Sequence, residues 1–517
     1  MTAFVRIASG SFATWSRVAI TLVSQLALVP VYLSFWPAET YGIWLALQTF
    51  YALGTIFGMA HLTFLENEFI RIGAADIRAL ERTLWSAVPI AVLVAVAQLL
   101  AVIGLWKTGL LAGLLAPNTG GDSVLITAAV WVALAQMVNW LIMVAAASVV
   151  VRALCGIGYY ARYAWLGVPF VLFNAAIPVA VLAGGGDLLE VGLSQVAVTF
   201  LFNAIWLLDG IRIAARSGIK YAPPDLRLGF LTLRRSLYVL LRLFLEMARQ
   251  TGFRLVMLPV VGPGKLAEFS TQRTAGNTVT QCMNSVYAPL LPELMRYVRD
   301  RKQEHMEGAF GILWMLLVLV FCPLTVVLQT VMPAIFPWWT RHAFAYDGVL
   351  LCYLSAGVLV NMVSMPAIAI CSANNLVALQ LRIAVVAAIL LFGALLPLTH
   401  VMGIRGAAVA LLIGELGASA LYVRDGARWI RGAGLAWPVR SFNICAIAVT
   451  TTISACALIA LWPHATESWL AIYLAAWSLG AMSLWNAAPN QARRYLADRI
   501  KELAVAARGG RHSLNGR

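Results

Sequence analysis

Long apolar stretches fill the sequence and restrict the chain to one class of fold. A helix that crosses a bilayer needs about 20 mostly apolar residues. Because hydrocarbon offers the backbone no hydrogen bonds, apolar stretches of this length must form helices. The sequence therefore predicts an all-α polytopic membrane protein with about fourteen transmembrane helices, at residues 12–36, 42–64, 84–106, 124–151, 164–185, 190–211, 236–261, 268–291, 309–336, 348–371, 381–399, 403–423, 442–462 and 469–488.

The composition excludes a soluble globular protein. Only 11% of the 517 residues are charged, against about 25% in soluble domains. The net charge of +15 would suggest nucleic acid in a soluble protein. Here it fits the excess of Lys and Arg in cytoplasmic loops, and no RNA-binding or zinc-finger pattern occurs. We therefore expect no nucleic-acid partner.

The distribution of Lys and Arg predicts the orientation of the chain. With the N-terminus inside, the inner segments contain 28 of the 37 basic residues and the outer loops contain four. This asymmetry places both termini in the cytoplasm of a multi-pass membrane protein. We expect the basic tail, residues 489–517, to lie on the inner leaflet, where anionic lipids attract it.

A basic segment with two adjacent prolines, residues 212–235, divides the chain into six helices before it and eight after it. The predicted parts are an N-terminal lobe (1–211), this cytoplasmic linker, a C-terminal lobe (236–423), two extra helices (424–488) and the tail. The run Leu28-Val29-Pro30-Val31 is echoed by Met257-Leu258-Pro259-Val260 in the seventh helix. Both copies run in the same direction, which indicates a parallel pseudo-repeat of two six-helix lobes.

The seventh and eighth predicted helices carry residues that hydrocarbon should reject. A charge at the bilayer centre costs about 2.5–3.5 kcal/mol on insertion scales, so such side chains should face a wet interior. In helix 236–261, Arg242, Glu246 and Arg249 share one face, and Arg254 follows five residues later.

The eighth helix repeats this pattern with mostly uncharged groups. Arg273, Asn277, Gln281 and Asn284 lie on one face of helix 268–291. Together with Arg17 in the first helix, the two polar faces predict a cationic, water-filled cavity. A guanidinium group matches phosphate oxygens bidentately, so such a cavity suits a diphosphate, and the amide face suits a glycan.

Each of these residues also has a structural interpretation. Arg17 and Arg242 are near enough to the cytoplasmic ends of their helices for their side chains to reach the headgroups. Arg249 is three residues from Glu246, so the two can form an ion pair within one helix. Glu415, beside Gly414 in the twelfth helix, is either an ion-coupling site or the partner of an arginine. Membrane amides either line the cavity or pair between helices, and these are Gln25, Gln48, Gln136, Asn139, Asn203 and Asn361.

No catalytic or cofactor motif occurs in the sequence. It lacks the metalloprotease, nucleophile-elbow and P-loop patterns, and its six histidines are scattered. The seven cysteines form no CxxC pair. We therefore expect a protein that is not an enzyme and has no metal and no cofactor.

Several short segments resemble polysaccharide-export flippases of the Wzx type. Val29–Gly42 is similar to the first outer turn of that family, and Gly262–Arg273 to the matching turn of the second half. Pro289 and Pro292 fit the end of the eighth helix, and Met402–Ala408 fits the start of the twelfth. The family belongs to the multidrug/oligosaccharidyl-lipid/polysaccharide (MOP) exporter superfamily.

The resemblance implies two helical lobes around a central cavity and transport by alternating access. The implied substrate is an undecaprenyl-diphosphate-linked oligosaccharide, flipped across the bacterial inner membrane alongside other polysaccharide-assembly proteins. One alternative is an ion-coupled multidrug efflux carrier of the same superfamily. Against it, Glu39, Glu66 and Glu68 are the only acidic residues among the first 75, and all are expected in loops. A second alternative, a glycan polymerase or ligase, usually needs a large outer loop, which this sequence lacks.

Overall fold

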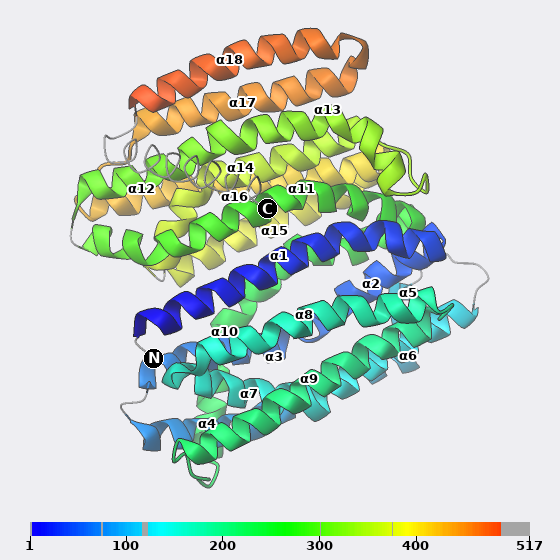
Figure 1. Ribbon diagram of the computed structural model, residues 1–517, viewed down its shortest axis with the longest axis vertical. Coiled ribbons are helices and arrows are strands. Elements are labelled where there is room, and N and C mark those ends of the chain that lie inside the picture. The colour runs from blue at the N-terminus through cyan, green and yellow to red at the C-terminus, as the bar shows by residue number, and fades with distance from the viewer. Residues whose placement is uncertain (1–2, 74–75, 116–122, 300, 375, 488–517) are drawn as a thin grey trace, which may run out of the picture. The chain divides into compact units, whose positions relative to one another are not determined.

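The described residues of the chain are helical almost throughout. The structure, a computed structural model, describes residues 3–73, 76–115, 123–299, 301–374 and 376–487, and no strand occurs within these ranges. This confirms the predicted all-α class (Figure 1). The predicted basic tail, 489–517, and the side chains of Asn284, Pro289 and Pro292 lie outside the described set.

The chain forms two compact units. Unit 1 contains Met1–Thr274, Pro337–Ala345 and Phe392–Ala407, and unit 2 contains the remainder. The predicted lobe boundaries stay a prediction. The helices up to Gly252, all in unit 1, are α1 (Ala3–Phe35), α2 (Ala38–Gly54), α3 (Ile56–Ile72), α4 (Ile77–Lys107), α5 (Leu110–Leu115), α6 (Ser123–Asn139), η1 (Trp140–Val144), α7 (Ala145–Leu154), η2 (Cys155–Tyr159), α8 (Tyr160–Ala183), α9 (Leu188–Arg216), α10 (Leu226–Met247) and η3 (Ala248–Gly252).

The later helices lie mainly in unit 2, although several cross between the units. They are α11 (Phe253–Arg299), α12 (Gln303–Leu316), η4 (Leu317–Phe321), α13 (Cys322–Trp339), α14 (Gly348–Ala373), α15 (Val377–Met402), α16 (Ile404–Gly432), α17 (Val439–Leu461), η5 (Pro463–Ala465) and α18 (Thr466–Ala487). A core centred on Trp314 and Phe310 holds unit 2 together. The indole of Trp477 donates a 2.7 Å hydrogen bond to the Val318 carbonyl in the π-helical turn η4.

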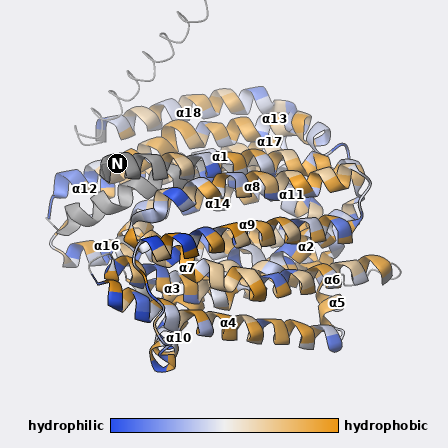
Figure 2. Cartoon of the chain, turned by 60° about the horizontal axis from the view of Figure 1, so that its bottom comes forward, coloured by the Kyte–Doolittle hydropathy of each residue, from blue (hydrophilic) through white to orange (hydrophobic). Residues whose placement is uncertain are grey.

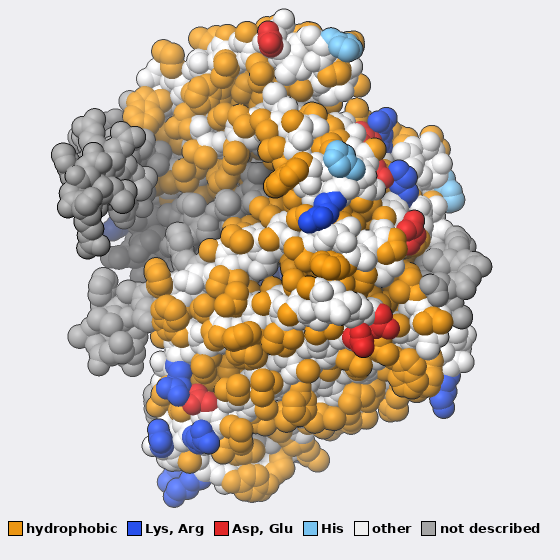
Figure 3. All heavy atoms as spheres, turned by 45° about the vertical axis from the view of Figure 1, so that its right-hand side comes forward, with side chains coloured by type: hydrophobic (Ala, Val, Ile, Leu, Met, Phe, Trp, Pro, Cys, Tyr) orange, Lys and Arg blue, Asp and Glu red, His pale blue; other side chains and the backbone are white. Residues whose placement is uncertain are grey.

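All fourteen predicted segments coincide with helices. Among the described residues, ten helical stretches are long and apolar enough to cross a membrane, or eleven with the bent pair α2–α3. One stretch, Val124–Ala183, contains two predicted segments separated by a break at Gly158. The helix bodies are largely hydrophobic in Figure 2, and on the face in Figure 3 charged side chains occur only in small groups. The protein is therefore a polytopic membrane protein.

The boundary between the seventh and eighth predicted helices is a break at Gly262 inside α11. Gly262 has φ 79° and ψ 166°, a conformation that favours glycine, and Pro263 follows it. The Pro263 carbonyl then comes so close to Gly42 that a Cβ on Gly42 would be only 2.0 Å from its oxygen. The segments that follow the two echoed runs therefore pack directly on one another within unit 1.

The second predicted helix, 42–64, is not straight. α2 and α3 meet at a 50° bend at Thr55, and α3 continues to Ile72, beyond the predicted end. A bend leaves carbonyl groups without helical partners, and hydrocarbon cannot satisfy them. The Gln98 side chain on α4 donates a 2.7 Å hydrogen bond to the Gly54 carbonyl at this bend. A side chain of another helix therefore satisfies a carbonyl at the bend.

The connection before α10 is short and is held by α4. The helix begins at Leu226, ten residues before the predicted membrane segment, and Asp225 caps it by accepting from the Leu228 amide at 3.0 Å. Arg82 on α4 binds Asp225 at 2.6 Å, and this contact holds the pKa of Asp225 below its usual range. Trp85, also on α4, donates to the Lys220 carbonyl. Residues 217–225 therefore form a loop that packs against α4.

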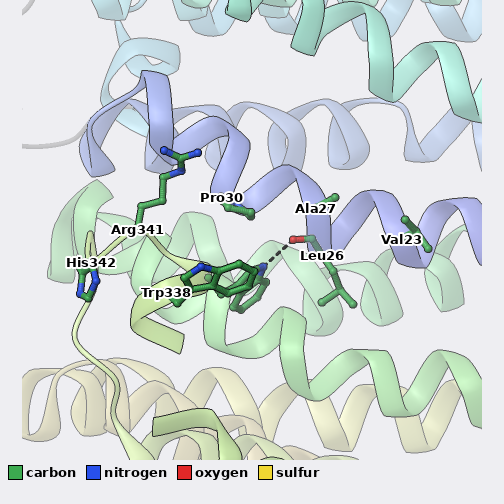
Figure 4. A pocket seen from close by; sticks show the side chains of 8 residues that line it. Val23, Leu26, Ala27, Pro30, Trp338, Arg341 and His342 are labelled. Atoms are coloured by element: carbon green, nitrogen blue, oxygen red, sulfur yellow. Dashed lines mark hydrogen bonds between the residues drawn. The ribbon is translucent and has the colours of Figure 1, made fainter. Parts of the chain in front are cut away.

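An indole completes the hydrogen bonding of α1. Pro30 lies inside α1 and has no N–H, so the carbonyl four residues earlier, Leu26, lacks its helical donor. The buried Trp339 indole donates to this carbonyl at 2.7 Å (Figure 4). The surrounding pocket has a volume of about 740 Å³ and is lined further by Trp338 and Arg341. Trp339 thus supplies the donor that Pro30 removes.

The bond between Trp339 and Leu26 can be tested with a double-mutant cycle. We expect Trp339→Phe to lower the free energy of unfolding by about 1–3 kcal/mol, because it leaves a buried carbonyl unpaired. In the Pro30→Ala background the helix regains its own N–H, so the same change should cost clearly less. Thermal unfolding of the purified protein in detergent measures both costs. Equal costs in the two backgrounds would contradict this role of Trp339.

Candidate functional site

Arg249 lies on a π-helical turn in the middle of the seventh predicted helix. This turn, η3, interrupts the α-helical ladder between α10 and α11. The Arg249 side chain is 9% exposed and donates a 2.9 Å hydrogen bond to Glu246, whose side chain is 47% exposed. The predicted pairing between these two residues is therefore present. π-helical turns frequently occur at functional sites, because the extra residue changes the direction of side chains.

Arg273 on α11 is bound to the same π-helical turn. Its guanidinium donates to the Gln250 carbonyl at 2.6 Å and to the Gln250 side-chain oxygen at 3.3 Å. It also lies over the Phe253 ring, 4.8 Å from the centroid. Arg273 is buried, so it holds η3 against α11 and adds positive charge beside Arg249. Its predicted role in substrate binding stays a prediction.

Arg254 lies five residues after Arg249, within electrostatic range of Tyr41 on α2. Its Nε atom is buried and has no hydrogen-bond partner among the described residues. Further along α11, Glu268 is buried and is paired with Lys265 at 2.6 Å. Arg254 therefore offers a buried donor that no described group accepts.

The remaining predicted residues of these helices are partly exposed. Arg242 lies on α10, and Asn277 and Gln281 lie on α11. The division between the units falls at Thr274, so Arg273 belongs to unit 1 and the two amides belong to unit 2. In unit 2, Glu415 accepts a 3.3 Å hydrogen bond from Asn361. Its predicted role in coupling or ion pairing stays a prediction.

Three of the six predicted membrane amides line one pocket of unit 1. Gln48, Gln136 and Asn139 line a cavity of about 250 Å³. Gln48 donates to Gln195 of α9 at 2.9 Å, whereas the side-chain oxygens of Gln136 and Asn139 are buried and have no partner among the described residues. Asn139 on α6 also donates from its side-chain nitrogen to the Val196 carbonyl on α9, at 3.5 Å. Gln48 and Asn139 therefore both bond between helices and line the pocket.

Arg17 lies in a second pocket of unit 1, with two charged residues that the sequence analysis did not select. This pocket, of about 260 Å³, is lined by Arg17, Glu66 and Arg152. The structure corrects the expected position of Glu66, because α3 extends through it to Ile72. Arg152 was counted with the inner loop, yet it lies within α7, and its Nε is 3.4 Å from Glu66. The sequence did contain a signal for this site, because Arg152 stands within an apolar run.

Comparisons with known proteins identify the fold. The sequence matches no known family model and no curated protein. Solved structures of MATE transporters are similar. An inward-facing multidrug resistance MATE transporter of the MOP superfamily has a TM-score of 0.58 at 14% identity, over 84% of this chain and 99% of that one. An outward-facing form gives 0.57 at 13%, and a MATE structure in the straight conformation 0.56 at 13%, each over 83% and 96%. The chain therefore has the fold of MATE transporters.

The structural role of Arg273 can be tested through stability. We expect Arg273→Gln to lower the free energy of unfolding by about 1–3 kcal/mol, because the charged donor to the Gln250 carbonyl is lost. Arg234→Gln, at an exposed arginine of α10, should change it by less than about 0.5 kcal/mol. Thermal unfolding in detergent measures both. A protein that keeps its stability after Arg273→Gln would show that the bond to η3 is dispensable.

Proposed function

We propose that this protein is a transporter that flips an undecaprenyl-diphosphate-linked oligosaccharide across the cytoplasmic membrane. The observation that carries the proposal is the arginine group of η3 and α11, which consists of Arg249, Arg254 and Arg273. Arg249 and Arg273 are buried, and the Nε of Arg254 is buried without an acceptor. The carboxylate paired with Arg249, Glu246, is half exposed. The group is therefore positively charged, which suits a diphosphate.

The fold supports transport as the general activity. MATE structures with this fold include inward-facing and outward-facing conformations. Two compact units in this chain are compatible with the same alternating access. The uncharged amides of the unit 1 pocket add hydrogen-bonding groups of the kind that recognise sugar hydroxyls. A glycan-bearing diphosphate uses both kinds of group, whereas a cationic drug would be repelled by the arginines.

A second candidate function, ion-coupled multidrug efflux, is favoured by one observation. Glu66 lines a pocket of unit 1, whereas its expected position in a loop had counted against this function. A carboxylate in such a pocket suits proton or cation coupling. Arg152 lies 3.4 Å from it, however, and this contact gives Glu66 a structural role as the partner of an arginine.

The arginine group can be tested in a strain deleted for the native gene. We expect Arg249→Ala to abolish surface polymer at normal protein abundance, because the diphosphate loses a charged donor. Arg249→Lys should keep part of the activity, since a point charge still attracts phosphate without the bidentate fit. Arg234→Ala, on the exposed face of α10, should export normally. Surface polymer is quantified, with membrane protein measured by blot.

Two outcomes of this experiment would count against a binding role. Full export by Arg249→Ala would remove Arg249 from the substrate site. Recovery of export in the double variant Glu246→Gln/Arg249→Gln would indicate that Arg249 serves only as the partner of Glu246.

The two candidate functions differ in what Glu66→Gln should do. For the flippase, we expect this variant to keep polymer export, and the wild-type protein to leave resistance to cationic drugs unchanged. For the efflux carrier, the wild-type protein should raise drug resistance, and Glu66→Gln should abolish that resistance by removing the coupling carboxylate. Drug susceptibility and surface polymer are measured in the same cells. Resistance that depends on Glu66, without polymer export, would overturn the proposed flippase.

A further inference from the structure

The pocket around Arg17 and Arg152 in unit 1 shares no lining residue with the arginine group of η3 and α11. Helices α1, α3, α7, α8 and α9 and the turn η2 each contribute to its wall. With a volume of about 260 Å³, it is smaller than the pockets of roughly 300–1,000 Å³ that hold drug-sized ligands. Its size therefore suits a compact group.

Buried hydrogen-bond donors line this pocket without described acceptors. The Trp206 indole Nε1 and the Tyr163 hydroxyl are buried, and neither has a hydrogen-bond partner among the described residues. An indole N–H can only donate, and a buried unpaired polar group costs about 1–3 kcal/mol. Both groups lie in the wall of the same pocket, so a single ligand with acceptor atoms would satisfy them together.

The charge of the pocket is positive. Arg17 and Arg152 contribute two positive charges, and Glu66 contributes one negative charge. The Arg152 Nε lies 3.4 Å from Glu66 and makes no hydrogen bond, although its Nη1 donates to the Ser148 carbonyl at 3.3 Å. Glu66 therefore neutralises only part of the charge, and donors of Arg152 remain for a ligand.

Arg17 is held over the pocket by close packing on α8. A Cβ on Gly167 would lie 3.1 Å from the Arg17 Cδ and Nε, so glycine leaves space for the guanidinium to lie against the helix. α1 and α8 are neighbours in unit 1, and Thr14 and Tyr160 link them by a 3.2 Å hydrogen bond. The exposed Arg17 is thus positioned by its surroundings at the mouth of the pocket.

From these observations we propose that the pocket binds a phosphate group, with Arg152, Trp206 and Tyr163 as its donors and Arg17 at its mouth. Guanidinium, indole and phenol groups offer N–H and O–H donors, and a phosphate offers several strong acceptor oxygens. The charge excess is small because Glu66 faces the same space. The carboxylate limits the affinity, so the phosphate group can leave again.

The position of the pocket admits two sources of phosphate. Arg152 lies near the end of α7, just before the break at Gly158, and Glu66 lies in the last two turns of α3. The charge distribution predicts that these helix ends are cytoplasmic. A lipid headgroup of the inner leaflet and a soluble phosphate compound could both reach this end. The proposal does not depend on which substrate the protein transports.

The experiment uses the full-length purified protein in two arms. In an uncharged maltoside detergent, inorganic diphosphate is titrated and its binding followed by calorimetry. In nanodiscs of phosphatidylcholine that contain a minority of phosphatidic acid, native mass spectrometry counts the bound phosphatidic acid. Binding in the first arm identifies a soluble phosphate ligand, and binding only in the second identifies a lipid headgroup. Either result supports the site if it responds to the pocket variants.

The variants separate this pocket from general surface charge. We expect Arg152→Gln to weaken binding about tenfold or more, since a charged hydrogen bond is lost. Trp206→Phe keeps an aromatic ring against Phe170 and removes only the N–H, so binding should weaken severalfold without unfolding. Glu66→Gln should tighten binding. The matched control is Arg162→Gln, because Arg162 lies near the same helix ends in an exposed pair with Asp209, and binding should not change.

Two results would overturn the proposal. The first is that neither probe binds the wild-type protein at millimolar concentration. The second is that binding survives both Arg152→Gln and Trp206→Phe. Trp206→Phe retains the packing of the ring, so it keeps the test decisive if Arg152→Gln lowers the yield. Loss of polymer export by Arg249→Ala tests the transport proposal separately, because Arg249 does not line this pocket.

Discussion

Hydrocarbon cannot satisfy a backbone carbonyl, and this constraint accounts for the hydrogen bonds at four irregular points of the structure. At Pro30 in α1, the Trp339 indole replaces the missing donor. At the α2–α3 bend, Gln98 donates to the Gly54 carbonyl. Two of the four π-helical turns among the described residues use the same solution, with Arg273 donating into η3 and Trp477 donating into η4. At each of these four points the donor is a side chain from another part of the sequence.

This dependence explains what could be predicted from the sequence. Most of the predicted helices follow from apolar length alone, because burial in lipid is a local property of each segment. The exceptions are the segments 236–261 and 268–291, which coincide with helices but are not among the ten or eleven stretches of the described residues that are apolar enough to cross a membrane. The division of α11 at Gly262 was also visible, since glycine followed by proline marks a turn. The bend at Thr55 was not visible, because the residue that stabilises it, Gln98, is on another helix. A hydrogen bond between two helices, such as this one, can be identified only from the tertiary structure.

The same distinction applies to the candidate sites. The arginines at 249, 254 and 273 stood out because charge inside an apolar helix is costly wherever it occurs. The structure adds that Arg273 contacts Gln250, a contact that no spacing rule predicts. Arg152 and Glu66 were assigned to loops because the ends of apolar runs are poorly defined, and Trp206 and Tyr163 resemble ordinary interface aromatics. Only their common position around one pocket gives them a role.

The boundaries between the two units have a mechanical consequence. The chain passes between the units at five points, and four of these lie inside α11, α13, α15 and α16. The fifth, after Ala345, is in a loop. A continuous helix resists bending because its hydrogen bonds form one ladder, so it behaves as a stiff rod and not as a hinge. At these four points the chain therefore has no flexible linker between the units.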